Sequence, residues 1–150
     1  MSSAATAPAD EARATMLAFY QRMLGGDADG ANDLISRDPD LVFIGSAGEW
    51  VADQEALRAG RLEPGEGLEA GSDPQAFVRG DVAWFVDQPT WHFGDGSSVK
   101  MRLSAVLQLE PAGWRIVHVH MSMGVPDDEC VALQRRWDHG IPMSVPISGR

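Results

Sequence analysis

The sequence predicts an α+β domain, in which three N-terminal helices cover the concave side of a curved antiparallel sheet. Two patterns lead to this expectation. Apolar residues recur at helical spacing before residue 60, whereas from residue 75 onward they alternate with polar ones, as in half-buried strands. Short gaps rich in Gly, Asp and Pro separate the strand-like runs, and short gaps make neighbouring strands antiparallel.

Composition argues against several classes of protein. The 150 residues suit one domain, and 44% of them are hydrophobic, which is enough for a core. A formal net charge of −10 disfavours binding to nucleic acids or anionic membrane surfaces. No apolar run is long enough to span a membrane, and the N-terminus lacks the features of a signal peptide. We therefore expect a cytoplasmic protein without an internal disulfide, since Cys130 is the single cysteine.

The first helix is expected to begin at Asp10, after a frayed tail over residues 1–9, and to end at Gly25. Its apolar face holds Met16, Leu17, Tyr20, Met23 and Leu24.

Two shorter helices follow. Asp27 is placed to cap the second, which is expected to end before Pro39 with Leu34 and Ile35 on its apolar side. The third spans residues 54–59 between Asp53 as its N-cap and Gly60 as its end.

The strands begin with residues 41–44 (LVFI), whose unbroken apolar character predicts a strand covered on both faces. Residues 60–74 predict a mobile loop with a weak edge strand near residues 67–70. Four further strands are expected at residues 75–79, 82–93, 99–110 and 114–123. A short helix over residues 127–137 and an extended end complete the chain.

The strand lengths predict curvature. Residues 99–110 would extend about 40 Å if straight, which is about the whole diameter of a compact domain of this size. Strands of that length must therefore twist, bulge and curl. The concave side of a curled sheet, covered by helices, is the default place for a ligand pocket.

A hairpin register that puts Glu110 opposite Trp114 separates two faces of the last two strands. The apolar face, directed at the helices, would carry Met101, Leu103, Ala105, Leu107, Leu109, Val117, Val119, Met121 and Met123. The other face, directed at water or another subunit, would carry Arg102, Ser104, Gln108, Trp114, His118, His120 and Ser122.

The order of the predicted elements resembles the nuclear transport factor 2-like superfamily, and most closely its SnoaL-like branch. The resemblance lies in helices followed by the segments LVFIG, RGDVAW and WRIVHVHMS. The last of these segments is also similar to the association domain of calcium/calmodulin-dependent protein kinases. The resemblance implies one domain over residues 1–150, with a cone-shaped core over about 10–126 and an appended end over 127–150. It further implies an internal pocket and a homodimer built on the outer face of the sheet.

The resemblance does not transfer a known chemistry. Phe19 stands where ketosteroid isomerases of this fold have a tyrosine, and LVFIG lacks their catalytic aspartate. Met121 and Ala105 stand where the kinase association domain has pocket arginines. The pocket that remains is more apolar, and its expected lining is Phe19, Tyr20, Trp50, Phe85, Trp91, Leu103, Ala105, Val119 and Met121.

Asp87 is the best candidate for a catalytic residue. If residues 82–93 pair with 99–110 through the five-residue turn, Asp87 faces inward with Phe85, Trp91 and Ala105. An inward carboxylate can act as a general acid or base. The alternative is a bulge near Pro89 that turns Asp87 towards water.

His118 and His120 form an H-x-H pair whose side chains share one face of a strand. A metal site would need a third ligand, and His92 is the only nearby histidine. The favoured interpretation places both rings on the polar outer face, so neither a metal nor a cofactor is expected.

Three functions remain open at this point. The first is a homodimer that binds a small hydrophobic molecule. The second is an enzyme of the isomerase, cyclase or hydrolase type, with Asp87 as the base and Tyr20 or Trp50 as positioning groups. The third is an oligomerisation module that uses the His118 and His120 face and the C-terminal tail.

Overall fold

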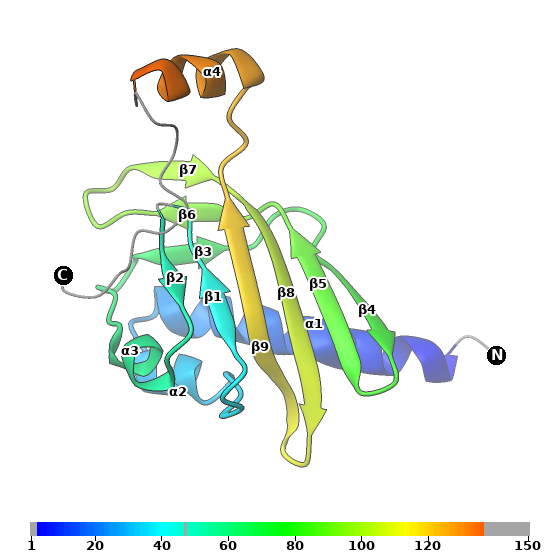
Figure 1. Cartoon of the computed structure of the whole chain (residues 1–150). Helices are drawn as coiled ribbons and strands as arrows, with labels where there is room; N and C mark the ends of the chain where they lie inside the picture. The colour runs from blue at the N-terminus through cyan, green and yellow to red at the C-terminus, as the bar shows by residue number, and fades with distance from the viewer. Residues whose placement is uncertain (1–2, 47, 137–150) are drawn as a thin grey trace.

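The structure is a computed structural model that describes residues 3–46 and 48–136. It has the predicted α+β architecture, in which helices pack against a curved, mainly antiparallel sheet. Figure 1 shows the long helix α1 (Ser3–Leu24) lying across one face of the larger sheet, with the two short helices beside it. These are α2 (Ala28–Asn32) and α3 (Gln54–Ala59).

The strands form two sheets, and one long hairpin contributes strands to both of them. The larger has the order β2-β1-β9-β8-β5-β4 and the smaller the order β3-β6-β7. The larger consists of β1 (Val42–Ile44), β2 (Trp50–Val51), β4 (Gln75–Arg79), β5 (Val82–Asp87), β8 (Arg102–Glu110) and β9 (Gly113–Ser122). The smaller consists of β3 (Gly67–Glu69), β6 (Thr90–His92) and β7 (Ser98–Lys100).

Helix α1 starts earlier than predicted. It begins at Ser3 rather than Asp10, and it contains Pro8. The N-terminal segment is rich in alanine, the residue with the highest helix propensity, which favours the added turns. The buried residues on its inner side are Ala12, Met16, Phe19 and Tyr20.

The caps of the short helices are confirmed. The Asp27 side chain accepts a hydrogen bond from Gly30 N, and the Asp53 side chain accepts one from Ala56 N. Helix α2 nevertheless ends at Asn32, so the prediction that Leu34 and Ile35 extend its apolar side was wrong. Ile35 instead forms a parallel bridge with Ile116 of β9, and this pairing carries its side chain into the core.

The predicted hairpin of residues 82–93 and 99–110 exists in one continuous register, but it bends. Asp87 lies opposite Leu103, and Thr90 lies opposite Lys100, so the alignment continues across the break. The two expected strands are each interrupted, after Asp87 and at Met101, and the tip of the hairpin joins β3 in the smaller sheet. Proline has no N–H for the ladder, and Met101 N donates to the carbonyl oxygen of Pro89 at 2.8 Å.

The hairpin of β8 and β9 contains a bulge that the sequence did not reveal. The register that places Ala105 opposite Val119 is the predicted one, but it shifts between Val106 and Leu107, so that Leu107 lies opposite Ile116. Val117 is the extra residue. In the part of β9 that precedes Val117, the residues that face inward are therefore those that were expected to face outward, and the reverse.

This exchange corrects two predictions. Trp114, expected on the polar face, is buried with 3% of its surface exposed, whereas Val117, expected on the inner face, lies beside His118 at an outer groove. Leu109, at the end of β8, is 46% exposed rather than covered by helices. Leu103, Ala105 and Leu107 are buried as expected.

The remaining elements differ little from the predictions. The edge strand expected near residues 67–70 is β3, and β4 has the predicted bounds. Strand β1 pairs in parallel with β9, but its residues are only half-buried because β2 beside it is short. Helix α4 (Asp127–Arg136) follows β9, and Trp137 and the predicted extended end lie outside the described residues.

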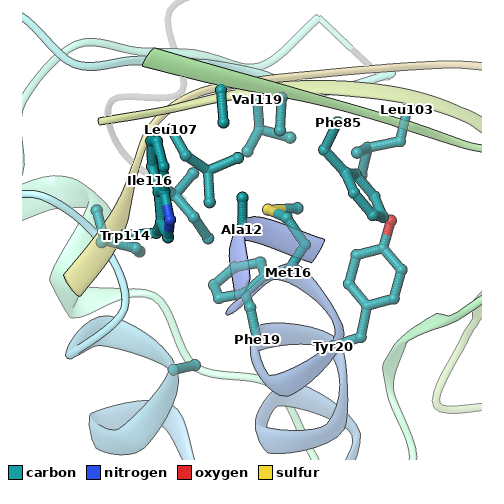
Figure 2. Close-up of a cluster of buried hydrophobic side chains, with 14 of the residues drawn as sticks. Ala12, Met16, Phe19, Tyr20, Phe85, Leu103, Leu107, Trp114, Ile116 and Val119 are labelled. Atoms are coloured by element: carbon teal, nitrogen blue, oxygen red, sulfur yellow. The ribbon is translucent and has the colours of Figure 1, made fainter. Parts of the chain in front are cut away.

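The core lies between α1 and the larger sheet. Figure 2 shows Met16 and Phe19 of α1 directed at the side chains of Leu107, Ile116 and Val119. All five are buried, with between 0% and 7% of their surface exposed. Burying apolar side chains in this layer is the main favourable contribution to the stability of the fold.

We expect Leu107→Ala to lower the free energy of unfolding by about 2–5 kcal/mol, because Leu107 is completely buried and the change leaves a cavity. Leu109→Ala is the matched control on the same strand, and it should cost less than about 1 kcal/mol because Leu109 is 46% exposed. Urea denaturation of both variants gives the comparison. Equal losses would contradict the assignment of the inner face.

Candidate ligand cavity

A cavity of about 240 Å³ lies between the helices and the two sheets. Helix α1 contributes Phe19 and Met23, which are one turn apart on its inner side. The other apolar walls come from different elements, namely Ala28, Ala31, Ile35, Phe43, Leu57, Leu62, Leu68, Trp91, Val119 and Met121. Leu68 and Trp91 belong to the smaller sheet, so the bend in the hairpin closes one side of the cavity.

Polar side chains enter the cavity lining at two positions, Asn32 and Arg61; the rest of the described lining is apolar or glycine. Asn32 Nδ2 donates to the carbonyl oxygen of Arg58 at 3.2 Å, which ties the end of α2 to α3. Arg58 itself donates to the carbonyl oxygens of Asn32, Ile35 and Ser36, so its guanidinium belongs to this connection and not to the cavity.

Four of the residues predicted to bind a ligand line the cavity: Phe19, Trp91, Val119 and Met121. Four others, Tyr20, Phe85, Leu103 and Ala105, are buried in the adjoining core and do not line it. Trp50, predicted at the pocket mouth, is 57% exposed on β2 and is not part of the lining.

The lining residues contributed by α2, α3 and the segment after α3 were not predicted from the sequence. Met23 could have been found, since it lies four residues after Phe19 on the same helix. Gly60, Arg61 and Leu62 could not, because residues in an irregular segment carry no periodic signal that tells which side chain points inward.

Of the two orientations left open for Asp87, the structure has the inward one, with 7% of its surface exposed, but both of its carboxylate oxygens accept hydrogen bonds. Oδ1 accepts a hydrogen bond from Gln88 N at 2.8 Å, and Oδ2 accepts one from Gly71 N at 3.1 Å. A Cβ atom at Gly71 would lie 2.5 Å from the Gln88 oxygen and 2.6 Å from Asp87 Oδ1, so only glycine fits. Asp87 therefore fastens the segment between β3 and β4 to the end of β5.

Asp87 also borders a groove separate from the apolar cavity. This groove of about 620 Å³ is lined mostly by polar and charged side chains, among them Asp73, Thr90, Lys100 and Arg102. Neither Asp87 nor any other carboxylate belongs to the described lining of the apolar cavity.

Tyr20 lies beside Asp87 at the rim of the core. Its ring meets Phe85 edge-on, with centroids 6.1 Å apart and planes at 83° (Figure 2). Its hydroxyl is buried and has no hydrogen-bond partner among the described residues. Burial, and secondarily the negative charge of Asp87, raise the pKa of Tyr20 well above its ordinary value of 10.0.

The histidine pair lies on the outer face, in the predicted register. His118 Nδ1 is 2.8 Å from the carbonyl oxygen of Val42, and His120 lies opposite Ser104. His92 is on β6, where its Nε2 is 2.6 Å from Glu69 Oε2. Within residues 3–46 and 48–136, no three metal-ligating side chains are grouped.

The outer face of the larger sheet carries an exposed apolar patch of Phe77, Val82, Trp84 and Val86, which we call the outer patch. Their exposed fractions lie between 36% and 41%. Phe77 and Trp84 stack with centroids 5.5 Å apart, and Arg79 lies 5.6 Å above the Trp84 ring.

Comparison with known families is decisive for the fold family. The sequence profile of the SnoaL-like domain matches residues 12–126, which is most of the chain. The chain belongs to the SnoaL-like domain family. A search of curated proteins gives no match.

Several solved structures share this SnoaL-like fold. A protein of unknown function from Pectobacterium atrosepticum is 24% identical, with 79% of this chain and 91% of that chain covered and a TM-score of 0.65. A proposed dehydratase of the nuclear transport factor 2-like family from Streptomyces avermitilis is 18% identical, with 79% and 96% covered and a TM-score of 0.64. A proposed calcium/calmodulin-dependent protein kinase type II association domain from Thiobacillus denitrificans is 20% identical, with 75% and 94% covered and a TM-score of 0.56.

The profile match confirms the predicted SnoaL-like family, and the solved structures confirm the predicted fold. At such identities they show the fold alone, and a shared fold does not fix a chemistry. None of the described helices combines the length and apolar character that a membrane crossing requires.

We expect Tyr20 to remain protonated in the folded protein at pH values where free tyrosine ionises. Because Tyr20 is the only tyrosine, the near-ultraviolet absorbance of phenolate reports this residue alone. Its raised pKa stabilises the folded state below about pH 10, and this contribution falls by about 1.4 kcal/mol per pH unit above that value, since only the unfolded chain then loses the proton.

The denatured protein in guanidinium chloride is the control and should titrate near the ordinary pKa of 10.0. Tyr20→Phe should remove the alkaline loss of stability and cost little at neutral pH, because the hydroxyl has no partner to lose. A folded protein whose phenol titrates normally would contradict the burial of this group.

Proposed function

We propose that the protein binds a small, largely apolar molecule in the cavity and acts as a homodimer. The observation that carries the proposal is the cavity lining, in which twelve apolar side chains surround a space of about 240 Å³. An apolar cavity of about 150 Å³ in another protein accepts benzene, so this one has room for roughly ten non-hydrogen atoms. Apolar surroundings with few polar groups are typical of small-molecule sites.

Acid–base catalysis is supported less well. The inward position of Asp87 beside Tyr20 favours it, because the pair brings two titratable groups together. Both Asp87 oxygens are bonded to backbone N–H groups, however, and the described cavity lining contains no carboxylate, histidine or tyrosine. A pure assembly role is supported less well still, because it does not need a cavity.

The homodimer is proposed from the outer patch. Exposed apolar surface of this kind is unfavourable in water and marks interaction sites in many soluble proteins. Its aromatic pair, Phe77 and Trp84, belongs to the residue types enriched at protein interfaces. A twofold arrangement of two copies would cover the same patch on both.

To test the cavity, we expect toluene to bind wild-type protein and to shift the methyl resonances of Met23 and Met121. Ala28→Phe should abolish binding, because Ala28 is a half-buried lining residue and the larger ring occupies the space. Ala132→Phe on the exposed side of α4 is the matched control and should bind normally. Absence of toluene binding by the folded wild type would refute the proposal.

To test the dimer, we expect light scattering after size exclusion to give twice the chain mass of 16.2 kDa. Trp84→Glu should yield monomers, because it places a charge in the centre of the outer patch. Val131→Glu is the control, since Val131 is similarly exposed, at 43%, but lies on α4. A wild-type monomer at micromolar concentration would contradict the assembly.

A further inference from the structure

The described lining of the cavity contains one charged side chain, and its ion pair with a carboxylate is long and exposed. Arg61 follows α3 directly after Gly60 and belongs to the cavity lining. The neighbouring cation, Arg58, is different because its donors already bind the carbonyl oxygens at the end of α2. Arg61 is therefore the cation in this region that is placed to interact with a molecule in the cavity.

Two hydrogen bonds hold the Arg61 guanidinium in place. Its Nη1 donates to the carbonyl oxygen of Arg58 at 2.7 Å and to that of Gly60 at 2.8 Å. A guanidinium has five N–H donors, and these bonds use the two on Nη1. The donors on Nε and Nη2 make no hydrogen bond to any described residue. They therefore remain available to a hydrogen-bond acceptor on a ligand.

Asp29, the described carboxylate that pairs with the Arg61 guanidinium, is a weak partner. Asp29 Oδ1 is 3.9 Å from Arg61 Nη2, beyond hydrogen-bond distance, and the two side chains are 95% and 60% exposed. Exposed ion pairs of this length are weakened by water and salt. A ligand oxygen that reaches the guanidinium can displace Asp29 at little cost.

We propose that the ligand is an amphipathic acid, whose apolar body fills the cavity and whose carboxylate binds Arg61. This inference rests on the proposed ligand-binding function and specifies the chemical class of the ligand. Guanidinium and carboxylate match in geometry and form strong, charge-assisted hydrogen bonds. The protein as a whole carries a net charge of −10, which repels anions, so recognition of an acid requires a local cation of this kind.

The test compares octanoate with octan-1-ol, which share the same apolar chain. Each has close to the ten non-hydrogen atoms that the cavity can hold. Calorimetry measures the affinity at neutral pH, and the methyl shifts of Met23 and Met121 report entry into the cavity. Wild-type protein should bind octanoate more tightly than octan-1-ol.

Substitutions distinguish the contribution of the Arg61 charge to binding from the contribution of the apolar cavity. Arg61→Gln should weaken octanoate binding about tenfold, the loss of one charge-assisted hydrogen bond, and leave octan-1-ol unaffected. Arg13→Gln removes the same charge from α1, outside the cavity lining, and should change neither affinity. Asp29→Asn removes the competing carboxylate and should strengthen octanoate binding alone.

The outcomes distinguish this inference from the proposed function. If both compounds shift Met23 and Met121 but Arg61→Gln leaves octanoate unchanged, the acid-binding role of Arg61 is wrong and the apolar site stands. If neither compound shifts these methyl groups in folded wild-type protein, the ligand-binding function itself is wrong. Circular dichroism of Arg61→Gln establishes that the variant is folded.

Discussion

The bend of the long hairpin at Pro89 and Met101 is the constraint on which the rest of the structure depends. The hydrogen bond from Met101 N to the Pro89 carbonyl oxygen keeps the two chains paired while the regular ladder is interrupted. The register is the same before and after the bend, so inward side chains stay inward. Trp91 and β3 are thereby brought over the concave side of the larger sheet, where β3 packs against the end of α1.

The bend and the helices together leave a space that side chains do not fill. In the adjoining core, Met16 and Tyr20 are buried against the larger sheet. Leu68 and Trp91 of the smaller sheet form one wall of the cavity. Asp87 stands at the bend and binds backbone N–H groups on either side, which stabilises the junction. The inward carboxylate of Asp87 therefore has a structural role, and the proposed ligand binding depends on the apolar walls of the cavity and on Arg61.

Local sequence signals predicted much of the fold. The caps Asp27 and Asp53 were predicted because a side-chain acceptor before a helix satisfies free N–H groups. Strand β4 was predicted from the alternation of apolar and polar residues between turns. The bulge at Val117 was not predicted, because both of its neighbours, Ile116 and His118, suit a strand in either register. One extra residue was enough to exchange the faces below it.

The lining of the cavity was predicted in part, for a related reason. Phe19, Trp91, Val119 and Met121 belong to regular elements, where periodicity gives the direction of a side chain. Tyr20 and Phe85 point inward as well, but whether an inward residue meets a cavity or another side chain depends on packing between distant segments. Arg61 lies outside any periodic element, and its place at the cavity edge follows only from the three-dimensional structure.

The central claim is that the bent hairpin encloses an accessible apolar cavity. Diffraction from crystals held under xenon tests it most directly, because xenon enters apolar cavities and scatters strongly. The account predicts a xenon atom between Phe19, Leu68 and Val119. A well-ordered crystal with no xenon there, and with side chains filling that space, would contradict it.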